Sequence, residues 1–155
     1  MPEVPGSDPL SPEFIGAVTS SIGDFLDARR PLLADIGPEL GPLADQAALF
    51  LRGGKRLRPA FCWWAHLAAG GQPSAAVLTA AASLDLLHVS ALVHDDLMDC
   101  SDLRRGIPAA HITLTELHTR SAWRGSAKIF GAAGAILLGD LLLMWSAEMF
   151  NDAGL

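Results

Sequence analysis

Three closely spaced aspartates are the residues of this chain best suited to chemistry. They lie in the segment Asp95-Asp96-Leu97-Met98-Asp99, which ends a stretch rich in leucine and valine. If the segment is helical, Asp95 and Asp99 lie one turn apart and project to the same side. Adjacent carboxylates repel each other unless a cation lies between them. Mg²⁺ prefers oxygen ligands, and no cysteine pair typical of a zinc site accompanies these aspartates. The pattern predicts a magnesium site, with a solvated acidic helix end as the alternative interpretation.

Basic side chains lie close to these aspartates in the sequence. Arg104-Arg105-Gly106 follows directly, and arginine can bind phosphate oxygens through two parallel hydrogen bonds. His88 precedes Asp95 by seven residues, so a helix places it two turns away on the same stripe. These residues favour a phosphate site near the metal. A solvated loop and a core histidine are the alternatives.

A second basic segment reads Gly53-Gly54-Lys55-Arg56-Leu57-Arg58-Pro59. Its glycines allow close approach of a ligand to the backbone, and it leads into a helix whose N-terminus favours anions. It is not a Walker loop, because the GxxxxGK[ST] pattern is absent. A generic basic turn would look the same. Together the segments indicate two anion sites beside an apolar helix, which suits a substrate with a diphosphate head and a hydrocarbon tail.

The elements that would position these residues are helices, and the fold class predicted is all-α. Apolar residues recur at helical spacing, and no alternating strand pattern is evident. Residues 1–12 hold four of the ten prolines and are predicted to be a flexible tail, with Ser11 capping the first helix. Residues 13–155 form part of a single helical domain. The expected helices are 13–30, about 43–51, 58–68, 74 to 99 or 100, and 126–151, with 110–120 ambiguous.

Composition excludes several functional classes. Half of the 155 residues are hydrophobic and 18% are charged, as in a globular domain. The net charge of −6 argues against a nucleic-acid partner. Cys62 and Cys100 do not form a CxxC pair, so neither a zinc site nor a disulfide framework is indicated. A reducing, cytoplasmic location is therefore expected. The apolar run 131–150 contains Asp140 and Glu148, which favours a buried core helix over a transmembrane segment.

Four segments, in this order, resemble the trans-isoprenyl diphosphate synthases, the polyprenyl and geranylgeranyl diphosphate synthase family. They are GGKRLRP, LLHVSALVHDDLMD, RRG-P and GDLLL, within residues 45–150. The resemblance implies an isoprenoid-synthase helical bundle around a deep cavity, usually in a homodimer. It also implies a Mg²⁺-dependent, head-to-tail condensation of an allylic diphosphate with isopentenyl diphosphate.

The resemblance further implies a role for each site residue. Asp95 and Asp99 would ligate Mg²⁺ that holds the allylic diphosphate, with Asp96 supporting them and Arg104 binding the same diphosphate. The diphosphate of isopentenyl diphosphate would be bound by the remaining set, with the glycine shaping the loop: Gly54, Lys55, Arg58, His88 and Arg105. His94 matches a common residue before the motif and is assigned to packing.

The length of the product can be argued from the residues that precede Asp95. The hydrocarbon tail should run back along this helix. Ser90 and Ala91, the fifth and fourth positions before Asp95, are both small, and Leu87 lies further along. Family members that stop at fifteen carbons often have aromatic residues there. A product of twenty carbons or more is therefore expected.

The family has a second aspartate-rich motif in its C-terminal half, and no DDxxD follows Asp99. The chain is therefore expected to be the N-terminal half only, an incomplete bundle that is inactive alone. Three alternatives remain. A class I terpene cyclase would leave the GGKRLRP loop unexplained. A metal phosphohydrolase using His94 and Asp95 would need further histidine ligands. A non-catalytic partner subunit fits the length but would not need both anion loops.

Overall fold

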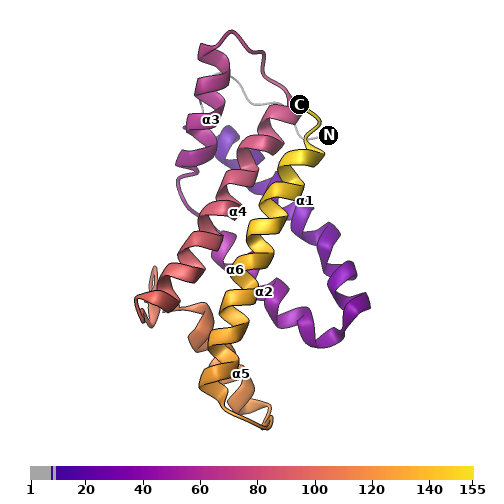
Figure 1. Ribbon diagram of the computed structural model, residues 1–155. Helices are drawn as coiled ribbons and strands as arrows, with labels where there is room; N and C mark the ends of the chain where they lie inside the picture. The colour runs from indigo at the N-terminus through magenta and orange to yellow at the C-terminus, as the bar shows by residue number, and fades with distance from the viewer. Residues whose placement is uncertain (1–7, 9) are drawn as a thin grey trace.

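The computed structural model describes residues 8 and 10–155, so most of the predicted tail lies outside the described residues. The all-α prediction is confirmed, since helices dominate the described chain (Figure 1). The elements in chain order are α1 (Pro12–Ile36), the 3-10 helix η1 (Pro38–Leu40), α2 (Gly41–Leu51), α3 (Leu57–Ala68), α4 (Ala75–Met98), β1 (Leu103–Arg104), β2 (Ile107–Pro108), α5 (Ala110–Arg120) and α6 (Ala127–Asp152).

Serine side chains begin the three longest helices. The Oγ of Ser11 accepts a hydrogen bond from the backbone N–H of Phe14, and Ser74 and Ser126 cap α4 and α6 in the same way. The predicted end of the first helix near residue 30 is wrong, because α1 continues through Pro31 to Ile36. Leu33 is buried in the core beyond the proline, and we attribute the continuation to this packing, which offsets the missing backbone N–H.

Two short β-strands accompany the helices, although the sequence shows no alternating strand pattern. Strand β1 pairs antiparallel with β2, with Leu103 opposite Pro108 and Arg104 opposite Ile107. Arg105 and Gly106 form the turn with φ values of 54° and 80°. Two successive positive φ values are typical of the tight turns that join antiparallel strands. Strands of two residues are too short to show an alternating pattern in the sequence.

Helix α4 is the centre of the fold and contacts α1, α2, α3, α5 and α6. It runs beside α6 along most of its length, with α3 packed against its first half and α5 lying against the beginning of α6 (Figure 1). The largest fully buried side chains hold this assembly together: Trp63, Phe14, Leu78, Leu86, Leu138, Leu142 and Met149. Because α4 ends at the aspartates, its packing sets where the predicted metal ligands lie.

Helix α6 is buried on one side only. The other face is exposed within the described chain and carries the apolar side chains of Ile136, Leu137, Leu143, Met144 and Phe150. Helices α4 and α6 are each long and apolar enough to cross a membrane. The buried core helices of soluble proteins meet the same criterion of length and composition. Most of the apolar window of α4 is buried inside the bundle, whereas less than half of that of α6 is.

A buried ion pair ties the basic loop between α2 and α3 to the central helix. The Nη1 of Arg56 donates to Oδ2 of Asp85 at 2.8 Å, and both side chains are buried. The Nη2 of Arg56 also donates to the carbonyl oxygen of Leu51 at 2.9 Å and to the Oγ1 of Thr19 at 3.2 Å. One guanidinium therefore joins α1, the end of α2, and α4. No pattern in the sequence indicates this role for either residue of the pair.

Removal of either partner of this pair should destabilise the fold. We expect Asp85→Ala to lower the free energy of unfolding by about 3–5 kcal/mol, because the Arg56 charge remains buried without its counterion. Urea denaturation followed by circular dichroism measures the change. Arg30→Ala is the control: it removes an exposed ion pair with Asp45 and should cost no more than about 1 kcal/mol. Equal small losses in both variants would contradict the assignment.

Candidate functional site

The five residues predicted to bind the second diphosphate line one pocket. Gly54, Lys55, Arg58, His88 and Arg105 surround a cavity of about 190 Å³ between the basic loop, α4 and the hairpin β1–β2. Gly54 has a φ of +96°, a conformation that side chains rarely adopt, which explains a glycine in this loop. Residues far apart in the sequence therefore converge as predicted.

The pocket is rich in positive charge without matching carboxylates. Among the described residues, Lys55, Arg58 and Arg105 form no ion pair, and the one carboxylate that lines the pocket, Asp85, is bound to Arg56. Partial burial lowers the pKa of His88, and the charge of Arg58 lowers it further. His88 is therefore mainly neutral near pH 7 and can donate one hydrogen bond. An anion is the ligand that this arrangement favours.

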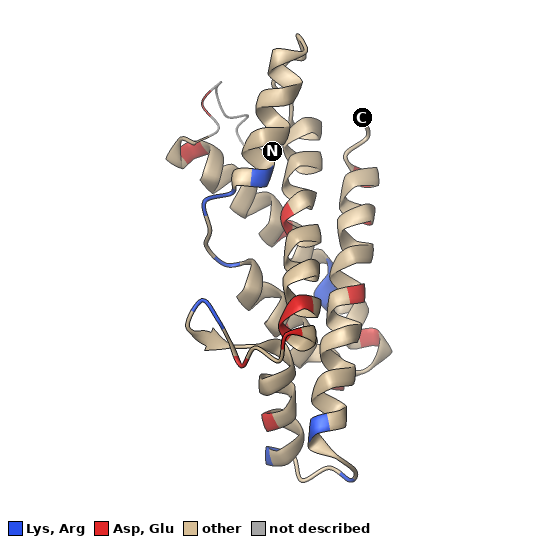
Figure 2. Ribbon diagram, turned by 60° about the vertical axis from the view of Figure 1, so that its left-hand side comes forward, with Lys and Arg blue, Asp and Glu red and all other residues tan. Residues whose placement is uncertain are grey.

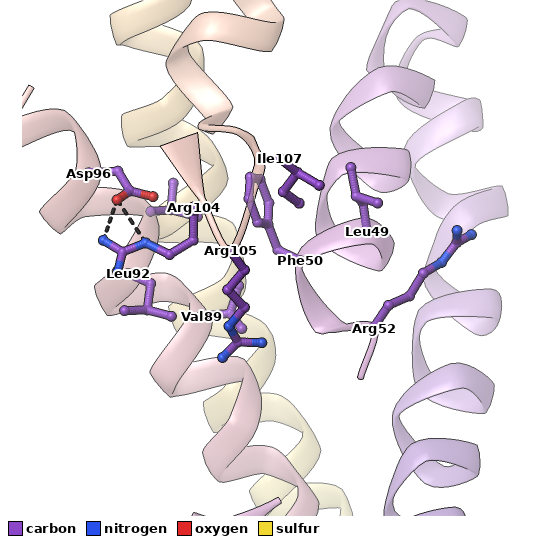
Figure 3. A pocket seen from close by; sticks show the side chains of 10 residues that line it. Leu49, Phe50, Arg52, Val89, Leu92, Asp96, Arg104, Arg105 and Ile107 are labelled. Atoms are coloured by element: carbon purple, nitrogen blue, oxygen red, sulfur yellow. Dashed lines mark hydrogen bonds and ion pairs between the residues drawn. The ribbon is translucent and has the colours of Figure 1, made fainter. Parts of the chain in front are cut away.

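The aspartates at the end of α4 differ sharply in their surroundings. Asp96 is 1% exposed, whereas the Asp95 side chain is 51% exposed and Asp99, the residue after the helix, is also exposed. The Nε of Arg104 donates to Oδ1 of Asp96 at 2.9 Å, and its Nη2 donates to the same oxygen (Figure 3). This hydrogen bond to Asp96 raises the pKa of Arg104. Asp96 is thus occupied by arginine, which leaves Asp95 and Asp99 as the accessible carboxylates.

The Asp96–Arg104 pair refines the predicted role of Arg104. This guanidinium neutralises Asp96, and its Nη2 also lies 3.5 Å from Oδ2 of Asp95. It lies at the edge of the acidic group and is held there by a buried partner. The sequence contained both residues, but no local pattern indicated that the hairpin would fold back onto the helix end.

The acidic group does not form a complete metal site by itself. Within residues 8 and 10–155, no three His, Cys, Asp or Glu side chains converge closely enough to hold a metal ion. Mg²⁺ commonly binds through one or two carboxylates and completes its shell with water and substrate phosphates. Asp95 and Asp99 fit that kind of site, in which the diphosphate is itself a ligand.

A second cavity lies beside the acidic end of α4 and shares Phe50, Val89 and Arg105 with the lining of the basic pocket. It has a volume of about 230 Å³, with Asp96 and Arg104 at one side and apolar walls from Phe50, Val89 and Leu92 (Figure 3). Arg105 lines both this cavity and the basic pocket. Figure 2 shows that charged ribbon positions are sparse along the length of α4 and α6 and that acidic ones gather where α4 meets the hairpin.

An open apolar groove of about 590 Å³ begins at Arg58 and His88. Leu87 and Ala91 line it, as expected for residues that contact a hydrocarbon tail, together with Phe61, Cys62 and Leu84. Ser90 does not line it. Its Oγ is buried against α6 and donates to the carbonyl oxygen of Gly139 at 2.7 Å, whereas Ala91 faces the groove. Successive helical residues point about 100° apart, which separates the two side chains.

Comparison with known proteins agrees with the resemblance in the sequence. Residues 43–154 match the family model of polyprenyl synthetase. Geranylgeranyl pyrophosphate synthase 12 of Arabidopsis thaliana is 40% identical over 116 residues, which are 72% of this chain and 28% of that protein. The large subunit 1 of the heterodimeric geranylgeranyl pyrophosphate synthase of the same plant is 34% identical. That match covers 95% of this chain and 35% of the length of the plant subunit. The chain thus spans about a third or less of these relatives.

A solved structure shares the fold. The geranylgeranyl pyrophosphate synthase of Corynebacterium glutamicum, crystallised with isoprenyl diphosphate and magnesium, superposes with a TM-score of 0.80 at 37% identity. The match covers 97% of this chain and 43% of that one. The predicted isoprenoid-synthase helical bundle is therefore confirmed, and the chain belongs to the polyprenyl synthetase family.

Proposed function

We propose that this chain provides the isopentenyl diphosphate site and the first aspartate motif of a trans-prenyltransferase. The reaction would be the head-to-tail condensation of an allylic diphosphate with isopentenyl diphosphate. The observation that carries the proposal is the convergence of Lys55, Arg58, His88 and Arg105 on one pocket whose cations are not neutralised. The names of the relatives support the same reaction class.

Asp95 and Asp99 would hold magnesium, which would neutralise charge on the allylic diphosphate as that group departs. The two adjacent arginines, Arg104 and Arg105, would have different roles. Arg104, held by Asp96, lies beside Asp95, where it can stabilise the same charge, and Arg105 faces the basic pocket. Separate positions for two diphosphates allow the two substrates to be bound together.

The apolar walls have a part in the same chemistry. Departure of diphosphate leaves an allylic carbocation, which water would capture. Val89 and Leu92 line the cavity between the charged groups, and Leu87 and Ala91 line the groove beyond. Side chains of this kind exclude water and bind the hydrocarbon part of the substrate. The double bond of isopentenyl diphosphate is the nucleophile, so no protein nucleophile is required. Its addition would leave a second carbocation, which would lose a proton to the departed diphosphate and so restore a double bond.

Two alternatives are weaker on these observations. A class I terpene cyclase acts on one diphosphate, which leaves the separate basic pocket without a ligand. A non-catalytic subunit would not need unpaired cations beside accessible aspartates. Because the chain spans only part of its relatives, we propose that it does not complete the reaction alone, and product formed by this chain alone would contradict that part.

The basic pocket should bind isopentenyl diphosphate. Arg58→Ala should weaken the affinity about tenfold or more, because it removes a hydrogen-bonded charge from an anion site. Isothermal titration calorimetry with the chain measures the effect. Arg30→Ala removes one positive charge outside the pocket and serves as the matched control. The proposal fails if both variants lose the same small amount of affinity or if the wild-type chain does not bind.

Anion binding to the pocket should depend on pH through His88. The pKa of His88 is lowered in the free protein, and a bound anion favours its protonated form, so affinity should rise as pH falls from about 8 to about 5. Sulfate is the probe, since its own charge is constant across this range. The charges of Arg58, Asp85, Arg105 and Arg104 also influence the pKa of His88. In His88→Gln the rise should be absent, and a rise of equal size would contradict the assignment.

The groove should control the length of the product, proposed as twenty carbons or more. In an active synthase that carries this segment, Ala91→Phe should shorten the product, because the new ring fills the groove beside Leu87. Product chain length is measured by chromatography after dephosphorylation. Ser90→Phe should instead reduce stability, since Ser90 is buried against Gly139. An unchanged product distribution for Ala91→Phe would contradict this role.

A further inference from the structure

The imidazole of His94 lies directly over Gly139 of α6. A methyl group added at Gly139 would come within 2.2 Å of Nε2 and 2.5 Å of Cδ2 of this ring. Nε2 lies 3.1 Å from the carbonyl oxygen of Ile136 and 3.5 Å from Oδ1 of Asp140, so a proton on Nε2 can be donated to either. The close approach of the two helices at this point therefore requires glycine.

A second side chain of α4 meets the same residue. Ser90, one turn before His94, donates from Oγ to the carbonyl oxygen of Gly139. Two successive turns of α4 are thus attached by hydrogen bonds to neighbouring turns of α6. This contact involves the first two residues of the GDLLL segment, Gly139 and Asp140, to which the proposed reaction assigns no role.

Three consecutive residues at the end of α4 point to three different places. His94 contacts α6, Asp96 binds Arg104 of the hairpin, and Asp95 between them is half exposed. Rotation of the helix end about its axis would break one contact or the other. The direction of the Asp95 carboxylate is therefore fixed from both sides.

We propose that His94 is a positioning residue for Asp95, acting through its hydrogen bond to the Ile136 carbonyl and its packing on Gly139. This inference rests on the proposed function, in which Asp95 is a metal ligand. It adds a residue that does not touch the metal or the diphosphate. The carboxylate of Asp140 lies 3.5 Å from the same imidazole nitrogen, on the α6 side of the contact.

The test is Mn²⁺ binding to the full chain in the presence of inorganic pyrophosphate, followed by electron paramagnetic resonance. His94→Leu, which keeps bulk but loses the hydrogen bond, should weaken Mn²⁺ affinity about tenfold, the size of loss typical when a residue that orients a metal ligand is removed. His94→Gln should restore most of the affinity, because its amide nitrogen can replace Nε2 as donor. Gly139→Ala should resemble His94→Leu, because the added methyl displaces the ring.

Gly23→Ala is the matched control, since this helical glycine has open space around its Cα and lies outside the site. Unfolding midpoints of all variants are measured separately. Weak Mn²⁺ binding in His94→Leu and Gly139→Ala, with recovery in His94→Gln, supports the inference. Equal affinity in the wild type and all variants overturns it while leaving the proposed function intact. Absence of Mn²⁺ and pyrophosphate binding in the wild type overturns the proposed function and the inference with it.

Discussion

The buried ion pair between Arg56 and Asp85 is the interaction on which the rest of the site depends. Two charges removed from water cost several kcal/mol, which is recovered only when the remaining donors and acceptors are satisfied. Arg56 meets this condition through additional bonds to Leu51 and Thr19. Because Arg56 points into the core, the loop that carries it is fixed against α4. Lys55 and Arg58 on either side then line the pocket.

In the hairpin too, one basic residue is bound to a buried carboxylate while its neighbour lines the basic pocket. Arg104 and Arg105 are adjacent in the sequence, yet Arg104 is bound to buried Asp96 and Arg105 lines the basic pocket without a carboxylate partner in the described chain. In both basic segments one arginine is held by a buried carboxylate, and the neighbouring cations keep their charge available for a ligand. This arrangement explains how a chain with a net charge of −6 can present a cationic pocket.

The members of the basic pocket were implied by the resemblance to the trans-isoprenyl diphosphate synthases, whereas most of the helices were predicted by local patterns in the sequence, because helical spacing and serine caps act over a few residues. These local patterns did not predict contacts between distant segments. Arg56 and Asp85 are 29 residues apart, and no local feature pairs them. The position of α6 likewise decides which face of α4 is buried, so that Ser90 contacts α6 while Ala91 lines the groove. Both features depend on tertiary packing, which local patterns do not specify.

Polar contacts give α4 an orientation that its apolar residues do not specify. Its hydrophobic side chains are spread around the helix, so burial alone would tolerate several rotations about the axis. Asp85, Ser90, His94 and Asp96 each bind a different partner, in the basic loop, α6 and the hairpin. An unsatisfied buried polar group is costly, so a rotated helix would lose several of these bonds at once. The few polar residues of an otherwise apolar helix thus determine the direction in which its accessible aspartate points.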